Sequence, residues 1–376
     1  MRTEPTGKPV VVYGVSGYTG RLICEYLREF NVPFIAAGRD AKKVQAALDK
    51  IPGLDTVEHD VVEVSHDVAS LTGLFEGASV VCNTVGPFIK YGPEAVEAAL
   101  AAGCHYTDTT GEQDWTLHAK NTWGEAFAEK GLLLSPGIAQ MYTTSEIAAN
   151  IALETPGLDT LDILVLWKGY PTFASTQTIF TILKADWYHL VENQYVAWDH
   201  KATRECVVPG SHGTALTVPW GGMAHPVWFS DDPRVANVTA TGGVFDRAVM
   251  DGVVATTGMF EEQIKPLEPA AQEAALADIA AGLQSDMPPR ENPRINTSID
   301  SVYASGPLGR AHVAIHGNQN YKQTGLLQAY AAYSLLQQPP KRVGFASGCQ
   351  AFGHRELLGV LRQFGLVLKP IVTIHD

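Results

Sequence analysis

A glycine-rich turn between an apolar run and an amphipathic run is the first feature of this sequence that could bind a ligand. The run VVVY (10–13) is followed by GVSGYTG (14–20) and then by RLICEYL (21–27). Glycines let the backbone approach a ligand, and the first turn of a helix offers N–H groups and a positive dipole. The spacing is G-x-x-G-x-x-G, not the commoner G-x-G-x-x-G. Its strand-to-helix context predicts a diphosphate site, and the alternative is a structural turn. The predicted contacts are Gly14, Ser16, Gly17, Tyr18, Thr19 and Gly20.

The residues after the second apolar run bear on which dinucleotide is bound. Arg39 and Asp40 stand there, followed by two lysines. An NAD site usually has an acidic residue here for the ribose 2′-hydroxyl, whereas a guanidinium can hold the 2′-phosphate of NADP. Arg39 therefore favours NADP(H), and the alternative is a solvated Arg39 beside an Asp40 that caps the next helix. Asp60, at the expected end of the third strand, is a candidate for the adenine region or else a loop acid.

Two further stretches are expected at the same edge of the sheet, where the reactive half of the cofactor would lie. The first, NTVGPF (83–88), is expected to form a glycine-proline turn whose amides can approach the nicotinamide and its ribose. The alternative is a turn that only connects a strand to the next helix. The predicted cofactor contacts here are Thr84, Val85, Gly86 and Pro87.

The second stretch, HYTDTTGE (105–112), supplies candidates for proton transfer. Asp108 is a candidate to orient a proton donor, and Tyr91, Tyr106 or His105 is a candidate to supply the proton. Asp108 as a helix cap is the structural alternative. No Tyr-x-x-x-Lys pair stands where a short-chain dehydrogenase has one, which leaves water or the substrate as another proton source.

The elements that would position these residues alternate regularly up to Pro136. Short runs rich in valine, isoleucine and alanine predict strands at about 9–14, 34–38, 56–61, 79–83, 105–108 and 131–135. Helices are predicted near 18–30, 40–50, 67–75, 92–102 and 114–130. This rhythm predicts an α/β fold with a doubly wound parallel sheet, which binds ligands at the carboxyl ends of its strands.

The pattern changes after Pro136, where a second, α+β domain is predicted. Helices are expected at 142–154, 322–337 and 355–364, and strands at 161–167, 206–208, 214–218, 299–305 and 311–316. Residues 286–290 are expected to form a surface excursion.

Four segments together resemble the saccharopine dehydrogenase-like oxidoreductases, a family that includes saccharopine reductases and trans-acting enoyl reductases. They are VVVYGVSGYTGRLICEYL (10–27), AAGRD (36–40), NTVGPFIKYG (83–92) and HYTDTTGE (105–112). The resemblance implies a Rossmann domain (1–140), a substrate and oligomerisation domain (141–320) and C-terminal helices that return to the first domain (321–376). It also implies hydride transfer to or from a C=N bond or a polarised C=C bond, with neither a metal nor a covalent nucleophile.

The composition of the middle of the chain bears on the substrate. Between residues 160 and 290 the arginines are Arg204, Arg234, Arg247 and Arg290, while aromatic residues are many. We therefore expect an apolar or aromatic substrate, with Trp167, Tyr170 and Gln177 as contacts. The expected activity is NADPH-dependent reduction of an enone or enoyl C=C bond. The alternatives are a C=N or C=O reductase of the saccharopine type, a lyase or transferase that retains the cofactor, and a non-catalytic NADP-binding sensor or scaffold.

Composition also limits the classes of partner and the compartments that we expect. The formal net charge of -13 argues against nucleic acid as a partner. The five scattered cysteines lack the spacing of a zinc site and are expected to be reduced thiols. We find no apolar run long enough for a signal peptide or a membrane span, and no metal-ligand pattern. We expect a cytoplasmic homodimer.

Overall fold

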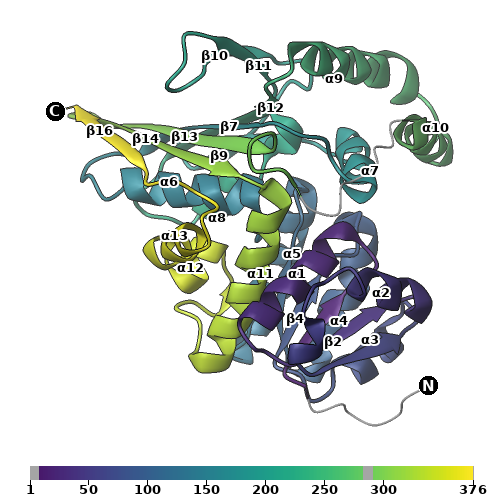
Figure 1. Ribbon diagram of the computed structural model, residues 1–376. Helices are drawn as coiled ribbons and strands as arrows, with labels where there is room; N and C mark the ends of the chain where they lie inside the picture. The colour runs from purple at the N-terminus through teal and green to yellow at the C-terminus, as the bar shows by residue number, and fades with distance from the viewer. Residues whose placement is uncertain (1–7, 283–290, 376) are drawn as a thin grey trace. The chain divides into compact units, whose positions relative to one another are not determined.

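The computed structural model describes residues 8–282 and 291–375, and their contacts divide the chain into two compact units (Figure 1). Unit 1 comprises Met1–Thr110, Trp115–Thr143 and Tyr321–Phe364. Unit 2 comprises Gly111–Asp114, Thr144–Asn320 and Gly365–Asp376. The excursion expected at 286–290 lies outside the described residues.

Unit 1 is built on a seven-stranded parallel sheet of order β15-β6-β5-β4-β1-β2-β3. The strands are β1 Val10–Tyr13, β2 Phe34–Gly38, β3 His59–Glu63, β4 Val80–Asn83, β5 His105–Asp108, β6 Leu133–Ser135 and β15 Gly344–Phe345. The predicted doubly wound sheet is confirmed. Because the order reverses between β1 and β4, the carboxyl ends of these two strands form the expected ligand-binding crevice.

Crossover helices connect these strands. They are α1 Tyr18–Glu29, α2 Ala41–Leu48, α3 Val68–Phe75, α4 Phe88–Ala102 and α5 Gln113–Glu129. Asp40 and Asp67 are the N-caps of α2 and α3, since their side chains accept hydrogen bonds from Lys43 N and Ser70 N. The helix α4 begins four residues before the predicted start at 92, because the turn at Pro87 already serves as its N-cap.

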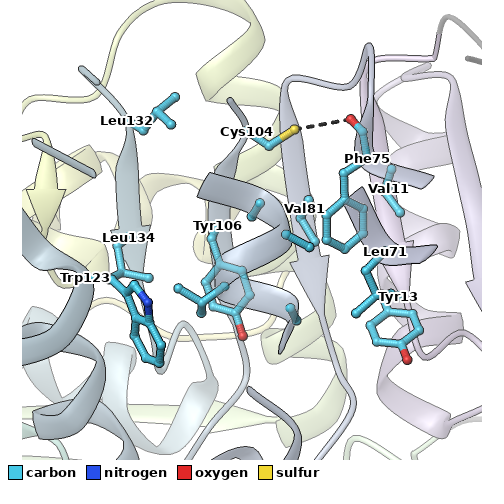
Figure 2. Packing of buried hydrophobic residues seen from close by; sticks show 14 of the residues in the cluster. Val11, Tyr13, Leu71, Phe75, Val81, Cys104, Tyr106, Trp123, Leu132 and Leu134 are labelled. Carbon is cyan, nitrogen blue, oxygen red and sulfur yellow. Dashed lines mark hydrogen bonds between the residues drawn. The ribbon is translucent and has the colours of Figure 1, made fainter. Parts of the chain in front are cut away.

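The core of unit 1 lies between one face of this sheet and α3, α4 and α5. Alternate strand residues such as Val11, Tyr13 and Val81 belong to the same buried cluster as Phe75 of α3 and Trp123 of α5 (Figure 2). Alternation places every second side chain of a strand on one face, and these positions are apolar here.

The contacts of the C-terminal helices group them with unit 1. These helices are α11 Asn320–Gln337, α12 Gly348–Phe352 and α13 His354–Gln363. A Cβ at Gly325 of α11 would lie 2.8 Å from Leu22 Cβ of α1, so the two helices are in close contact there. Gln328 Nε2 of α11 donates hydrogen bonds to the carbonyls of Asp108 and Ile138 at 2.6 and 2.9 Å.

Unit 2 contains a seven-stranded mixed sheet of order β16-β14-β13-β7-β12-β8-β9 and a separate pair, β10-β11. The strands are β7 Thr160–Trp167, β8 Tyr188–Val191, β9 Gln194–Ala197, β10 Arg204–Val207, β11 Thr214–Thr217, β12 Asn237–Val244, β13 Thr297–Ser305, β14 Arg310–Asn318 and β16 Ile371–His375. β12 runs parallel to β7, and the other neighbours are antiparallel.

Different elements pack against the two faces of this sheet (Figure 1). The helices of unit 2 are α6 Ser145–Ala152, α7 Phe173–Thr181, α8 His225–Phe229, α9 Arg247–Met259 and α10 Pro269–Gly282. Leu164, Leu166 and Ile299 pack against Val208 and Ala215 at the β10-β11 pair. The alternate residues of β7 and β13 therefore point to the opposite face, where α6 and α8 lie.

The last residues differ from the expectation that 321–376 returns to the first domain. From Gly365 on, the chain belongs to unit 2, where β16 pairs with β14. The run Ile371–His375 is β-branched and apolar, and its own strand pairing decides its location. No helix among the described residues is long and apolar enough to span a bilayer.

Candidate functional site: a dinucleotide cradle in unit 1 and an aromatic strand end in unit 2

The turn after β1 has the backbone geometry that the glycine pattern predicts. Gly14 has a backbone φ of +99°, which residues with a side chain rarely adopt, and a Cβ there would lie 2.5 Å from Thr84 Oγ1. The amides of Gly14 and Val15 donate to the carbonyl of Ala37 at 2.9 and 3.2 Å. The turn is thus held to β2 and fits closely against the residue after β4.

The other two glycines of the pattern act at the start of α1. A Cβ at Gly20 would lie 2.6 Å from Gly14 O and 2.8 Å from Val15 Cα, so only glycine lets the helix pack on the turn. A Cβ at Gly17 would meet only Gly14 O, at 3.2 Å. Gly17 is the N-cap, no side chain among residues 8–282 and 291–375 caps the helix, and its first turn has no acidic residue. This helix start favours an anionic group.

Two charged residues, Arg39 and Asp40, follow β2, and only Asp40 has a partner among the described residues. Asp40 caps α2, and Oδ1 accepts from Lys43 N at 3.1 Å, as expected for its capping role. Arg39 is exposed and makes no hydrogen bond or ion pair with the described residues. The carboxylate beside β2 therefore serves the helix, while the guanidinium can take a phosphate.

A cluster that we did not predict lies beside Arg39 at the carboxyl ends of β1 and β3. Tyr13 Oη lies 2.9 Å from His66 Nδ1, and His66 Nε2 lies 3.4 Å from Glu94 Oε2 of α4. Tyr91 contacts the His66 ring edge-on, with centroids 5.2 Å apart. Burial raises the pKa of Tyr13 to about 12, although Arg39 acts to lower it. The sequence did not predict this cluster, because its residues are far apart in the chain and His66 lies in a loop without a recognisable motif.

The turn after β4 is fixed by short-range hydrogen bonds. Thr84 Oγ1 donates to Tyr13 O at 3.0 Å, and Val85 N donates to Asn83 Oδ1 at 2.9 Å. Residues 84–87 are all partly exposed, whereas Asn83 is buried. The structure thus brings Thr84 and Val85 next to the Gly14 turn at the carboxyl edge of the sheet, and Gly86 and Pro87 connect them to the start of α4.

Asp108 is the centre of a buried hydrogen-bond network. Oδ2 accepts from Tyr106 Oη at 3.1 Å and from Trp115 Nε1 at 2.9 Å. Oδ1 accepts from Thr110 N at 3.0 Å and Gly137 N at 2.9 Å. Burial raises its pKa to about 6, and these four hydrogen bonds oppose that rise.

The network bears on the predicted proton-transfer residues. Asp108 and Tyr106 are each 0% exposed, so neither touches solvent. Tyr106 Oη also accepts from Asn83 Nδ2 at 2.9 Å, and His105 Nδ1 accepts from Leu133 N at 2.9 Å. Among the candidates, Tyr91 combines partial exposure with a hydroxyl that forms no hydrogen bond to the described residues. Of the candidates at this edge, the geometry therefore leaves Tyr91 best able to reach a ligand.

The structure does not place Asp60 at this edge. β3 begins at His59, so Asp60 is its second residue and pairs with Ile35 near the amino end of β2. Its carboxylate lies 3.5 Å from Lys8 Nζ. The predicted strand, 56–61, was placed too early because Leu54–Thr56 forms a 3-10 turn.

The three predicted substrate residues lie in unit 2. Trp167 ends β7, Tyr170 is 65% exposed in the following loop, and Gln177 is in α7. No hydrogen bond or ring contact joins the three within the described part of the chain. Trp167 instead contacts Trp220 edge-on, with ring centroids 6.4 Å apart.

A buried glutamine, also not predicted, supports the segment that carries Trp220. Gln113 Nε2 donates to the carbonyls of Gly222 and Met223 at 2.9 and 2.8 Å. Trp220 and Met223 have φ of +50° and +55°, and the two glycines between them also have positive φ. Strained backbone of this kind persists only where its surroundings hold it.

Two family profiles match the chain, and together they span nearly all of it. The saccharopine dehydrogenase NADP binding domain matches residues 10–129. A family of unknown function (DUF5938) matches residues 143–376. The Gly14 turn, the start of α1 and Arg39 lie within the first match, and Trp167 and Trp220 lie within the second.

Curated relatives match the first third of the chain. A lipid droplet localized protein of Caenorhabditis elegans is 36% identical over 131 residues, which cover 33% of this chain and 31% of that protein. The human saccharopine dehydrogenase-like oxidoreductase is 30% identical over 148 residues, 36% of this chain and 34% of that protein. A trans-acting enoyl reductase of Mycobacterium ulcerans is 32% identical over 124 residues, 32% of this chain and 30% of that protein. The matched region is thus about a third of each relative's length.

One solved structure is similar along the whole chain. The apo saccharopine dehydrogenase (L-Glu forming) of Saccharomyces cerevisiae aligns with a TM-score of 0.59 at 12% identity, covering 97% of this chain and 100% of that one. At this identity the similarity concerns the fold.

Proposed function

Because the chain belongs to the DUF5938 family and its residues 10–129 are a saccharopine dehydrogenase NADP-binding domain, we propose that it is an NADPH-dependent reductase. The reaction proposed is hydride transfer to a polarised C=C bond, as in an enone or enoyl compound, of a hydrophobic small molecule. One observation carries the proposal: the α1 start and Arg39 form a cradle at one edge of the sheet, beside the turn after β4.

The residues present fit the dinucleotide. The Gly14 turn and the uncapped start of α1 would receive the diphosphate, and Arg39 would hold the 2′-phosphate. When bound, NADPH supplies the hydride. The protein's part is to position the cofactor and the acceptor, to exclude water and to provide a proton. Tyr91 is the proposed proton donor, and Asp108 and Tyr106 are proposed to hold the sheet edge in place.

Three arginines of unit 2 support an uncharged substrate over an amino acid with several carboxylates. Arg204 pairs with Asp162 at 3.5 Å, and Arg234 pairs with Asp232 at 2.7 Å. Arg247 pairs with Asp251 at 3.0 Å and also contacts Glu205. These guanidiniums already have carboxylate partners within the protein, while Tyr170 and Phe173 are exposed. Trp167, Tyr170 and Gln177 are the proposed substrate contacts.

The test is NADPH consumption with a panel of an α,β-unsaturated ketone, an enoyl ester and a cyclic imine. We expect oxidation with a conjugated C=C acceptor. Arg39→Ala should raise the Kd of NADPH roughly 10- to 100-fold and leave NADH nearly unchanged, since charge-assisted hydrogen bonds contribute about 1.5–3 kcal/mol. Lys50→Ala, at an exposed position after α2, removes the same charge as a control. Binding of NADPH without turnover of any acceptor would contradict a reductase, and equal weakening of both nucleotides would contradict the role of Arg39.

We further propose a cytoplasmic homodimer. All five cysteines are free thiols, which supports a reducing compartment. Fractionation of cells tests the location. Recovery of the protein with lipid droplets, where the name of the Caenorhabditis relative places that protein, would contradict it.

A further inference from the structure

Two side chains stand opposite each other at the carboxyl end of β7 in unit 2. Trp167 of β7 is in register with Ser298 of β13. Lys168 N donates to Thr297 O at 2.7 Å, so the pair Trp167 and Ser298 is of the non-hydrogen-bonded type. In such pairs the two side chains lie on the same face and their Cβ atoms are about 4.5–5.5 Å apart. The indole and the hydroxyl are therefore neighbours on the face that α6 and α8 cover.

Both side chains carry a buried polar atom. Trp167 Nε1 and Ser298 Oγ are each buried and form no hydrogen bond among the described residues. Ser298 is 1% exposed, whereas the Trp167 side chain as a whole is partly exposed. Leaving a buried donor without an acceptor is destabilising, so two of them side by side in one strand pair need an explanation. A ligand acceptor would satisfy both.

The neighbours of the pair define the chemistry of this position. On the β14 side Ser298 is in register with Gly317, which has no side chain to fill the space, and on the β12 side Trp167 is in register with Val244. The edge-on contact of Trp167 with Trp220 adds an aromatic surface. Across the four neighbouring strands, the two hydrogen-bond donors of Ser298 and Trp167 therefore lie between Gly317 on one side and the apolar Val244 on the other.

We propose that Trp167 Nε1–H and Ser298 Oγ–H together bind an uncharged carbonyl oxygen of the substrate, with Trp220 against its apolar part. This inference rests on the proposed function and deepens it by naming the substrate group. An indole nitrogen only donates, so the ligand atom must be an acceptor. Two donors on a conjugated carbonyl would withdraw electrons from the C=C bond and favour hydride arrival at its β-carbon, with the proton going to the α-carbon.

A carboxylate fits this position less well than a ketone or an ester. Neither donor is charged, and the buried side chain of Asp300 points to the same face, two residues after Ser298 in β13. A second carboxylate near a buried acidic group would be disfavoured by repulsion and by desolvation.

The test compares three probes of one shape by calorimetric titration of the full chain with NADP⁺ bound. They are 4-phenylbut-3-en-2-one, its carboxylate analogue cinnamate and the hydrocarbon 3-methyl-1-phenylbuta-1,3-diene, in which a CH₂ group replaces the carbonyl oxygen. The protein variants are Trp167→Phe, Ser298→Ala and the double variant, which remove the donors and keep most of the volume. Trp187→Phe, at an indole that donates to Ile182 O at 2.8 Å, is the control for loss of an indole N–H elsewhere.

We expect the enone to bind more tightly than either analogue. Each single variant should weaken the enone about 3- to 10-fold, which is the usual contribution of one hydrogen bond. The double variant should bind enone and hydrocarbon alike. Thermal midpoints of the ligand-free Trp167→Phe and Ser298→Ala proteins should be unchanged or raised, because each loses an unsatisfied group, whereas Trp187→Phe should be less stable.

Other results would overturn the inference. These are absence of enone binding, unchanged enone binding in the double variant, tighter binding of cinnamate than of the enone, or a fall in stability that marks both donors as structural. NADPH binding, measured in parallel, separates the two proposals. If the wild type does not bind NADPH, the proposed function fails, whereas NADPH binding without these probe effects refutes this inference alone.

Discussion

At the scale of single residues, Asp108 shows how a chemically suggestive side chain can serve the fold. Its two oxygens accept hydrogen bonds from four donors, among them Tyr106 and Trp115, and no part of it is exposed. The donors come from β5, the segment after it, α5 and the turn after β6. A carboxylate can accept from all four at once, whereas few other side chains can. We infer that Asp108 ties these segments together at the carboxyl edge of the sheet.

The pH dependence of stability tests this role. The pKa of Asp108 is raised to about 6, so the folded chain keeps a proton that the unfolded chain releases near pH 4. This contribution is complete below the unfolded pKa and is lost as pH rises through 6. The free energy of unfolding should therefore fall by up to about 1.4 kcal/mol per pH unit between about pH 4 and pH 6. Urea unfolding across this range measures it.

Asp108→Asn removes this titration and turns one acceptor into a donor. We expect a loss of about 1–3 kcal/mol near pH 5, because an N–H₂ group would face two existing donors. The difference in stability between the wild type and the variant should change with pH across this window. Asp55→Asn, at an exposed carboxylate, should follow the wild type. Parallel profiles for Asp108→Asn and the wild type would show that Asp108 does not titrate as described.

At the same scale, local chemistry was predictable and long-range partners were not. Gly14 and Gly20 could be identified because their requirement is for glycine itself, between a strand and a helix. Asp40 could be identified as a cap because its donor is three residues away. His66 beside Tyr13 could not, because only the packing of β1 against the loop after β3 brings them together.

At the scale of elements, the start of α1 separates a packing requirement from a binding requirement. A Cβ at Gly20 would meet backbone atoms at 2.6 and 2.8 Å, which cannot move without shifting the helix. Gly20→Ala should therefore lower stability by about 1–3 kcal/mol and weaken both nucleotides. Gly17→Ala meets one oxygen at 3.2 Å, so it should keep the wild-type thermal midpoint and still weaken NADPH and NADH alike.

Thermal unfolding and nucleotide titration of both variants check this difference. Gly73→Ala is the matched control, since nothing lies within 4 Å of its Cβ position inside α3 and alanine is the better helix former. It should be neutral or stabilising. A Gly20→Ala protein as stable as the wild type would refute the packing argument.

The strands missed from the sequence have physical reasons in common. β12 contains Gly242 and Gly243, residues that usually indicate a turn. A Cβ at Gly243 would lie 2.8 Å from Leu216 O, so the close approach of β11 requires glycine there. β15 has two residues and exists only because β6 offers an edge. Such elements are decided by their neighbours.

At the scale of the whole molecule, the fold of unit 1 was predictable because each strand and helix has its own local pattern. Unit 2 was predictable only in part. Its sheet joins strands far apart in the chain, so that β7 lies between β12 and β13, and β14 lies between β13 and β16. Local patterns give strand existence but not this order. The assignment of 365–376 to the first domain failed for the same reason.

The outer strand of that sheet leads to a prediction about assembly. β16 is a terminal strand whose Val372 and Ile374 point to one face and are 47% and 53% exposed. An exposed apolar edge strand is a template for pairing, and the edges of proteins that stay monomeric usually carry charges or proline. Pairing of β16 with its copy about a two-fold axis would satisfy its free backbone groups and cover these side chains.

Light scattering after size-exclusion chromatography should give twice the chain mass of 40.5 kDa for the wild type. Val372→Lys with Ile374→Lys should give the single-chain mass, because two lysines on the edge strand repel their copies and stay hydrated. Leu308→Lys is the control, since this residue is 92% exposed in the β13–β14 turn and its change also adds a positive charge. It should remain dimeric. If the edge-strand variant stays dimeric while NADPH binding shows it to be folded, the dimer forms through another surface. A monomeric wild type would remove the dimer altogether.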